Sequence, residues 1–159
     1  MELQSFLGFV NYVRRFLPNM ARVTAPLTDL FRKGTGYRWG EKEQAAFSVL
    51  KTFLCSIPVL HNADTHRPFK VITDASDIVI EVVLLQDIGE GLQPIAYESQ
   101  KLHPLKRNYP IHDKEMLAIM HAFNVWWCYL TGASVTVRTD HQSLQYIRAQ
   151  PLLNPRQIW

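Results

Sequence analysis

Two short β-branched segments of this chain each end in a Thr-Asp pair. One runs from Phe69 to Asp74 and the other from Val135 to Asp140, and the apolar stretch between them carries Glu115. A strand that ends in a carboxylate, a helical carboxylate and a second such strand form an arrangement typical of metal-dependent nucleases. We therefore predict that Asp74, Glu115 and Asp140 lie together in one metal site.

The predicted chemistry is hydrolysis of a phosphodiester. At neutral pH this reaction needs a strong nucleophile and relief of negative charge, and two Mg²⁺ ions about 4 Å apart supply both. Mg²⁺ prefers carboxylate oxygens. Two Mg²⁺ ions are the expected cofactor, with Mn²⁺ as the substitute. The alternative for each acid taken singly is a solvated or capping side chain, and only the three positions together favour a metal site.

The N-terminal third is predicted to be helical. Apolar residues recur at helical spacing over residues 3–17, and Pro18 ends the pattern. Thr24 is the predicted N-cap of a short helix that ends near Phe31. A third helix is predicted over residues 41–56, since acids in its first turn favour a helix start and Pro58 ends it.

From residue 69 onward the pattern changes to that of strands. Residues 69–73, 78–86 and 92–97 are predicted to form an antiparallel meander. A buried helix over residues 113–129 then leads to a strand at 134–139, which the right-handed crossover places parallel to a meander strand. A short helix is predicted at 141–148. The predicted buried stripe of the long helix contains Met116, Ile119, Met120, Phe123 and Trp127.

The net charge of +3 is unevenly distributed. Residues 1–70 hold ten Lys and Arg against five Asp and Glu, whereas residues 71–159 hold seven against nine. A basic half suits a phosphate backbone and an acidic half suits divalent cations, although two ordinary solvated surfaces explain the charges equally well.

Membrane and secretion signals are not recognisable in the sequence. It has no apolar run of about 18 residues and no signal-peptide pattern. We expect an intracellular protein, cytoplasmic or nuclear, that is not secreted and has no membrane partner. The two cysteines, Cys55 and Cys128, are expected to be reduced core thiols.

A series of ordered motifs resembles the polymerase-to-RNase H stretch of gypsy-type LTR retrotransposon pol polyproteins. The resemblance covers essentially the whole chain. The motifs include Leu7-Gly-Phe-Val-Asn-Tyr-Val-Arg-Arg-Phe-Leu17, Ala25-Pro-Leu-Thr-Asp-Leu30, Trp39, Pro58-Val-Leu60, Thr73-Asp-Ala-Ser-Asp77, Pro94-Ile-Ala-Tyr-Glu-Ser99, Lys114-Glu-Met-Leu-Ala118 and Thr139-Asp-His-Gln-Ser-Leu144.

The resemblance implies an α/β fold of RNase H-like type, with three antiparallel strands, a parallel fourth and a missing C-terminal strand, after a small helical segment. It divides the chain into residues 1–60, the thumb or connection end of a reverse transcriptase, and residues 61–159, an RNase H-like domain truncated at its C-terminus. It also matches Asp74, Glu115 and Asp140 to the family's metal-binding carboxylates.

The activity implied by the resemblance is Mg²⁺-dependent cleavage of the RNA strand of an RNA–DNA hybrid, which leaves a 3′-hydroxyl and a 5′-phosphate. The expected partners are the hybrid and the remainder of the pol polyprotein, with the oligomeric state left open. The candidates for gripping the duplex are Arg14, Arg15, Arg22, Arg32 and Lys33.

Three departures from the family pattern predict impaired activity. Val79 and Glu81 stand where the family usually has glycines, the sequence stops at Trp159 before a fourth acid is supplied, and the polymerase palm is absent. Side chains at these glycine positions are expected to crowd the sheet or the hybrid, and Glu81 adds repulsion toward phosphate. The alternative function is a degenerate, non-catalytic module that binds nucleic acid or another pol segment.

Overall fold

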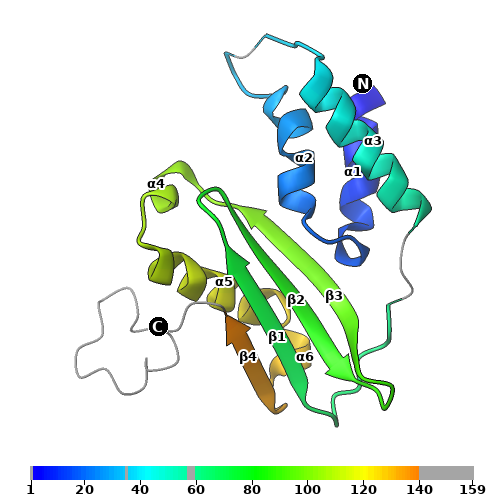
Figure 1. The fold of residues 1–159 in the computed structure, drawn as a ribbon, viewed down its shortest axis with the longest axis vertical. Helices are drawn as coiled ribbons and strands as arrows, with labels where there is room; N and C mark the ends of the chain where they lie inside the picture. The colour runs from blue at the N-terminus through cyan, green and yellow to red at the C-terminus, as the bar shows by residue number, and fades with distance from the viewer. Residues whose placement is uncertain (1, 35, 57–59, 140–159) are drawn as a thin grey trace.

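The helices of the N-terminal third form a lobe of their own. The structure, a computed structural model, describes residues 2–34, 36–56 and 60–139. Residues 2–56, here called the helical lobe, lie at one end of the molecule, and residues 60–139, the sheet lobe, lie at the other (Figure 1). The helical lobe comprises α1 (Glu2–Tyr12), the 3-10 helix η1 (Arg14–Phe16), α2 (Met20–Asp29) and α3 (Glu41–Cys55).

Two of these helices differ from the prediction. The helix predicted over residues 3–17 ends at Tyr12, and Leu17 is extended (φ −121°, ψ 123°), as a residue before proline prefers. The N-cap predicted at Thr24 is wrong, because Thr24 lies inside α2 and its hydroxyl donates to the Met20 carbonyl at 2.7 Å. α2 begins instead after Asn19, which has φ 56°.

The third helix agrees with the prediction to within one residue at its C-terminal end. Glu43 explains its start, since its carboxylate accepts a hydrogen bond from the Gly40 backbone N–H at 2.9 Å. Ala46 and Leu50 are buried on its inner face. They join Val10, Leu17, Met20 and Leu27 in a hydrophobic core that belongs to the helical lobe.

The sheet lobe contains a mixed four-stranded sheet in the order β3-β2-β1-β4. Its strands are β1 (Phe69–Ala75), β2 (Val79–Asp87), β3 (Leu92–Lys101) and β4 (Val135–Thr139). β1, β2 and β3 form the antiparallel meander, and β4 pairs with β1 in parallel. The predicted RNase H-like α/β fold is confirmed for the residues described. The predicted helix at 141–148 lies outside them.

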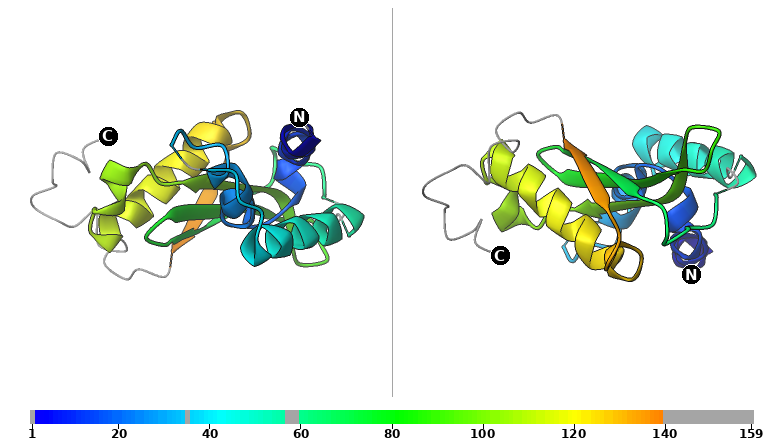
Figure 2. Two further views of the ribbon diagram at one scale, coloured as in Figure 1. Left: turned by 90° about the horizontal axis from the view of Figure 1, so that it is seen from above. Right: turned by 90° about the horizontal axis from the view of Figure 1, so that it is seen from below.

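One face of the sheet is covered by a long helix. α4 (Pro104–Arg107) precedes α5 (Ile111–Val125) and α6 (Trp127–Leu130), and α5 runs along the sheet in both views of Figure 2. Side chains of β1 alternate in burial, so Phe69, Val71, Thr73 and Ala75 point toward α5. Asp74, between Thr73 and Ala75, therefore points to the opposite face.

The buried stripe of α5 is not the one predicted. Ala118 and Ala122 are fully buried against the sheet, whereas Met116, Ile119, Met120 and Phe123 are half-buried and Trp127 is 64% exposed. Small residues allow the helix axis to approach the strands closely, so the long side chains lie at the flanks of the contact. Glu115 lies on the same face as the alanines, three residues before Ala118.

The two lobes are joined through β3. Arg14 of η1 forms an ion pair with Glu98, the Ala21 backbone N–H donates to Ser99 Oγ at 2.7 Å, and Lys101 Nζ donates to Asp29 at 2.8 Å. These contacts hold η1 and α2 against the outer edge of the sheet.

Two further sequence predictions concern cysteine burial and membrane spans. Cys55 and Cys128 are free thiols, but both are exposed, so their predicted place in the core is wrong. They lie on helix surfaces because neighbouring positions fill the cores. None of the described helices combines the length and the apolar composition that crossing a membrane requires.

Candidate active site at the end of strand β1

Asp74 is exposed near the C-terminal end of β1. Its direct cross-strand neighbour is Glu81 of β2. Among the described residues Asp74 has no hydrogen-bond or ion-pair partner. Its carboxylate is therefore available to a ligand on the face of the sheet opposite α5.

Glu115 approaches the same end of β1 from the other face. It is 2% exposed, and its Oε1 accepts a hydrogen bond from the Ala75 backbone N–H at 3.0 Å. Its Oε2 accepts hydrogen bonds from Thr139 Oγ1 at 2.8 Å and from Thr73 Oγ1 at 3.5 Å. Glu115 thus links the ends of the parallel strands β1 and β4, where the sequence predicted that a helical carboxylate would arrive.

Two of the three predicted ligands can be placed. Asp74 and Glu115 reach the end of one strand from opposite sides, and Asp140, which follows the last residue of β4, lies outside the described residues. Within residues 2–34, 36–56 and 60–139, no three His, Cys, Asp or Glu side chains are close enough together to hold a metal ion. The convergence of the complete trio stays a prediction.

Glu81, the cross-strand neighbour of Asp74, has a shifted pKa. Burial, and then the nearby negative charge of Asp74, raise the pKa of the Glu81 carboxyl above its ordinary value of 4.5, while Arg22 opposes the rise. Arg22 is exposed on α2, in the helical lobe. The electrostatics of this site therefore involve both lobes.

A second charged pair lies just beyond β1. Lys114, whose side chain is 5% exposed, donates to Asp77 at 2.7 Å. That hydrogen bond and the charge of Lys114 lower the pKa of Asp77. The backbone groups of the turn are held by Ser76, whose Oγ accepts from the Val79 N–H at 3.1 Å.

A small hollow adjoins Asp74 and brings in residues that the sequence prediction missed. Its volume is about 170 Å³, and it lies between β1, β2, β3 and the start of α2. Its lining includes Asp74, Glu81 and Glu98 from the sheet together with Pro18 and Asn19 from the helical lobe. Pro18-Asn19 is recognisable in the sequence only as a helix stop, and its place beside Asp74 depends on how the lobes pack.

The five basic candidates differ in their surroundings. Arg14 is engaged with Glu98, and Arg32 pairs with Asp29 at 3.1 Å. The Arg15 guanidinium lies 5.3 Å from the centre of the Phe16 ring. Arg22 and Lys33 are exposed. Their predicted role on a nucleic-acid backbone stays a prediction.

Comparison with known proteins identifies the family. A family model described as an RNase H-like domain found in reverse transcriptase matches residues 39–137. The Transposon Tf2-3 and Tf2-4 polyproteins of Schizosaccharomyces pombe are each 37% identical to this chain over 146 residues. The match covers 90% of this chain and 11% of each polyprotein, so the chain spans about a tenth of the length of these relatives.

Solved structures resemble the chain over nearly its full length. A foamy viral protease-reverse transcriptase dRH in complex with ds DNA superimposes with a TM-score of 0.79 at 24% identity, covering 95% of this chain and 27% of the other. The foamy viral protease-reverse transcriptase in complex with RNA/DNA hybrid gives 0.76 at 24%, covering 99% and 22%. These likenesses show the fold. The family model, which matches more than half of the residues, shows that this chain belongs to the RNase H-like domains found in reverse transcriptases.

Proposed function

We propose that this chain is the RNase H part of a retroelement pol polyprotein and cleaves the RNA strand of RNA–DNA hybrids with Mg²⁺. Asp74, Glu115 and Asp140 are the proposed metal-binding carboxylates. The observation that carries the proposal is the position of Glu115, a buried carboxylate held at the end of β1 beside the strand position of Asp74.

Asp74 offers the ligand chemistry that a divalent cation needs. Asp74 and Glu81 are carboxylates directly opposite each other, and like charges in such a position repel. A cation bound at Asp74 relieves that repulsion, and carboxylate oxygens are the ligands that Mg²⁺ and Mn²⁺ prefer. When bound, two such ions activate water and neutralise charge on the phosphate.

The protein's own contribution is to orient the acids. The Ala75 N–H and the Thr139 hydroxyl fix both oxygens of Glu115, so its side chain loses little freedom when a ligand binds. Lys114, next in sequence, is tied to Asp77 and fixes the turn that follows Asp74. Strand β1 and helix α5 are thereby locked together around the site.

The proposed substrate and partners follow from the relatives and from charge. One structural neighbour is in complex with an RNA/DNA hybrid and another with ds DNA. The basic helical lobe suits the phosphates of such a duplex, with Arg22 the candidate nearest the acids in electrostatic terms. The relatives are far longer polyproteins, so we propose the remaining pol segments as protein partners. We also propose that the chain divides near residue 60 into the thumb or connection end of a reverse transcriptase, residues 1–60, and the RNase H-like domain, residues 61–159.

A hybrid-cleavage assay tests this function. The chain is incubated with an RNA–DNA hybrid labelled on the RNA strand, with Mg²⁺ and with EDTA. Cleavage that leaves a 3′-hydroxyl and a 5′-phosphate, needs Mg²⁺ and disappears in Asp74→Asn is the expected result. The matched control is Asp87→Asn, an exposed acid at the other end of β2, which should cleave like the parent. Equal cleavage by Asp74→Asn and the parent would refute the assignment.

A non-catalytic module is the second candidate, and Glu81 favours it. A carboxylate opposite Asp74 repels the phosphate that the reaction must bring there. We propose that it impairs cleavage, so Glu81→Gly should cleave faster than the parent. Hybrid binding without cleavage in both the parent and Glu81→Gly would favour the non-catalytic module.

A further inference from the structure

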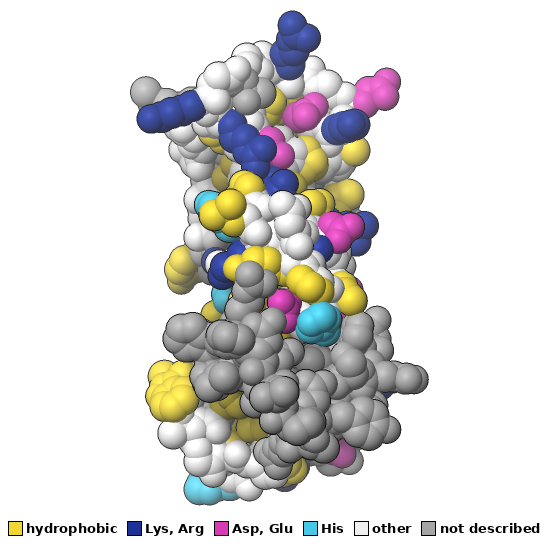
Figure 3. Space-filling model, turned by 90° about the vertical axis from the view of Figure 1, so that its left-hand side faces the viewer, with side chains coloured by type: hydrophobic (Ala, Val, Ile, Leu, Met, Phe, Trp, Pro, Cys, Tyr) yellow, Lys and Arg dark blue, Asp and Glu magenta, His cyan; other side chains and the backbone are white. Residues whose placement is uncertain are grey.

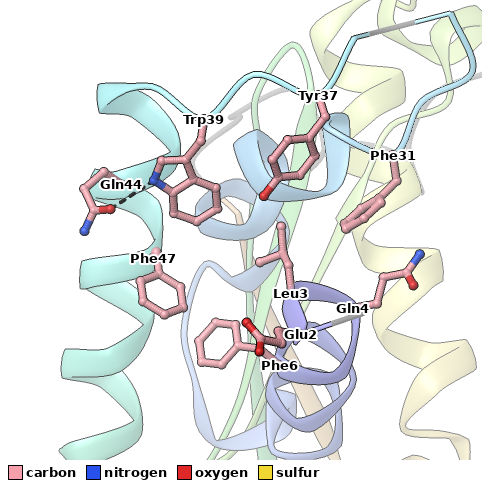
Figure 4. Close-up of a pocket in the computed structure, with 9 residues that line it drawn as sticks. All are labelled: Glu2, Leu3, Gln4, Phe6, Phe31, Tyr37, Trp39, Gln44 and Phe47. Atoms are coloured by element: carbon pink, nitrogen blue, oxygen red, sulfur yellow. Dashed lines mark hydrogen bonds between the residues drawn. The ribbon is translucent and has the colours of Figure 1, made fainter.

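An aromatic pocket in the helical lobe has no part in the proposed cleavage. It has a volume of about 770 Å³ and lies between the start of α1, the segment after α2 and the start of α3. Figure 4 shows the rings of its lining around a common space. The lining residues are Glu2, Leu3, Gln4, Phe6, Phe31, Tyr37, Trp39, Gln44 and Phe47.

Three of the aromatic side chains are unusually exposed. Phe31 is 42% exposed, Tyr37 61% and Trp39 40%. All three belong to the connection between α2 and α3, outside any helix or strand. A buried ring contributes much more to stability than an exposed one, so this cluster of half-open rings on one rim marks a surface suited to binding.

A hydrogen bond and ring contacts fix the side chains of the pocket. Trp39 Nε1 donates to Gln44 Oε1 at 3.0 Å, which fixes the indole. The Trp39 ring meets Phe47 edge-on at a centroid distance of 5.9 Å, and Phe47 packs on Phe6 at 4.8 Å. Phe6 and Phe47 pack against the hydrophobic core of the helical lobe, so the base of the pocket is formed by side chains in fixed positions.

The positively charged residues beside the pocket indicate an anionic ligand. Lys33, Arg38 and Lys42 alternate with the rim aromatics along the chain, are exposed, and form no ion pair with another described residue. Lys51 Nζ lies 5.0 Å from the centre of the Phe47 ring. In Figure 3, Lys and Arg side chains stand out over the upper, helical end of the molecule. Aromatic faces beside unpaired cations are the combination that binds single-stranded nucleic acid.

We propose that the aromatic pocket binds unpaired nucleotides, with bases stacked on Tyr37 and Trp39 and phosphates at the flanking cations. Gln4 and Gln44 also line the pocket, and amide groups can form hydrogen bonds with base edges. A duplex hides its base faces, so single strands are the form that can stack. This site goes beyond the proposed cleavage and does not depend on it.

Binding of labelled oligonucleotides tests the site. Fluorescence anisotropy with the full 159-residue chain compares 12-nucleotide oligo(dT) and oligo(rU) with a blunt duplex of the same length. Tyr37→Ala and Trp39→Ala should each weaken single-strand binding about tenfold, the usual effect of losing one base stack. Trp39→Phe, which keeps an aromatic face, should recover much of the affinity. The two strand types show whether ribose or deoxyribose is preferred.

A matched control and a stability check make the result decisive. Tyr12 is 84% exposed in the same lobe but does not line the pocket, so Tyr12→Ala should bind like the parent. Circular dichroism melts show whether each variant is folded. If Trp39→Ala does not fold, the binding of Tyr37→Ala decides the test. Unchanged binding in Tyr37→Ala, an equal loss in Tyr12→Ala, or preferred binding of the blunt duplex would each overturn the proposal.

Discussion

Asp74 and Glu81 are direct cross-strand neighbours on the face of the sheet opposite α5. Two carboxylates in this position repel each other, and the pKa of Glu81 is raised by burial and by the charge of Asp74. The folded chain therefore holds a proton on Glu81 more tightly than the unfolded chain does. The associated stability is complete below pH 4.5 and declines as the pH rises through the raised pKa.

The first prediction follows from this loss of stability as the pH rises. Glu81→Gln should raise the free energy of unfolding at pH 7, by a few tenths to about 1 kcal/mol, and leave it nearly unchanged at pH 4. Urea unfolding at the two pH values measures the difference. Glu90→Gln, an exposed acid in the β2–β3 turn, is the control. A gain of the same size at both pH values would contradict the electrostatic explanation.

The second prediction concerns Glu115 as a structural link. Glu115→Ala removes the acceptor for the Ala75 N–H and the Thr139 hydroxyl, and each unsatisfied buried group costs about 1–3 kcal/mol. We expect a loss of about 3 kcal/mol for Glu115→Ala and about 1 kcal/mol for Glu115→Gln, which keeps one acceptor oxygen. Chemical denaturation measures both. Equal stabilities for the two variants would mean that these hydrogen bonds contribute little.

The third prediction tests the close approach of α5 to the sheet. Ala118 is completely buried, so Ala118→Leu must displace the helix or distort its neighbours, at about 1–3 kcal/mol. Hybrid cleavage should fall as well, because Glu115 moves with the helix. Val125→Leu, at a position 46% exposed on the same helix, is expected to change neither property. Thermal melts and initial cleavage rates report the two effects. An Ala118→Leu variant as stable and active as the parent would argue against tight packing here.

The fourth prediction concerns Asn19, the non-glycine residue with a positive φ (56°) in the described part of the chain. Glycine adopts this conformation without strain, whereas alanine does so at about 1 kcal/mol or more. Asn19→Gly should be as stable as the parent, and Asn19→Ala should melt at a lower temperature. Differential scanning calorimetry decides between them. A stable Asn19→Ala variant would show that the junction relaxes to another backbone conformation.

Sequence patterns located the elements that carry the acids but not how those elements meet. The β-branched runs placed β1 and β4 within two residues, and the acids at the start of α3 placed that helix, because these signals are local. The pairing of Asp74 with Glu81 depends on the register of β1 against β2, which the sequence pattern left open. The stripe of α5 was misjudged because hydrophobicity ranks Met116 above Ala118, whereas close packing favours the smaller side chain.

Asn19 shows the same limit of local patterns in the helical lobe. It is the N-cap of α2 and has a left-handed conformation, five residues before the predicted cap at Thr24. Hydrophobic periodicity does not predict the left-handed conformation of Asn19. Asn19 lies near Asp74 only because two segments that are distant in the sequence pack together. The arrival of Glu115 at the C-terminal end of β1, in contrast, follows from strand direction and helix crossover, which leave few alternatives.

The attachment of η1 and α2 to β3 through Glu98, Ser99 and Lys101 has a consequence for where a cut would fall. Three polar links along one strand connect the helices to the sheet that carries Asp74. A duplex held by the helices would then present the same phosphate to the acids each time it docks. In the proposed reaction, cleavage would then occur at a set number of base pairs from the end that the helices hold, and loosening those links would make that number vary.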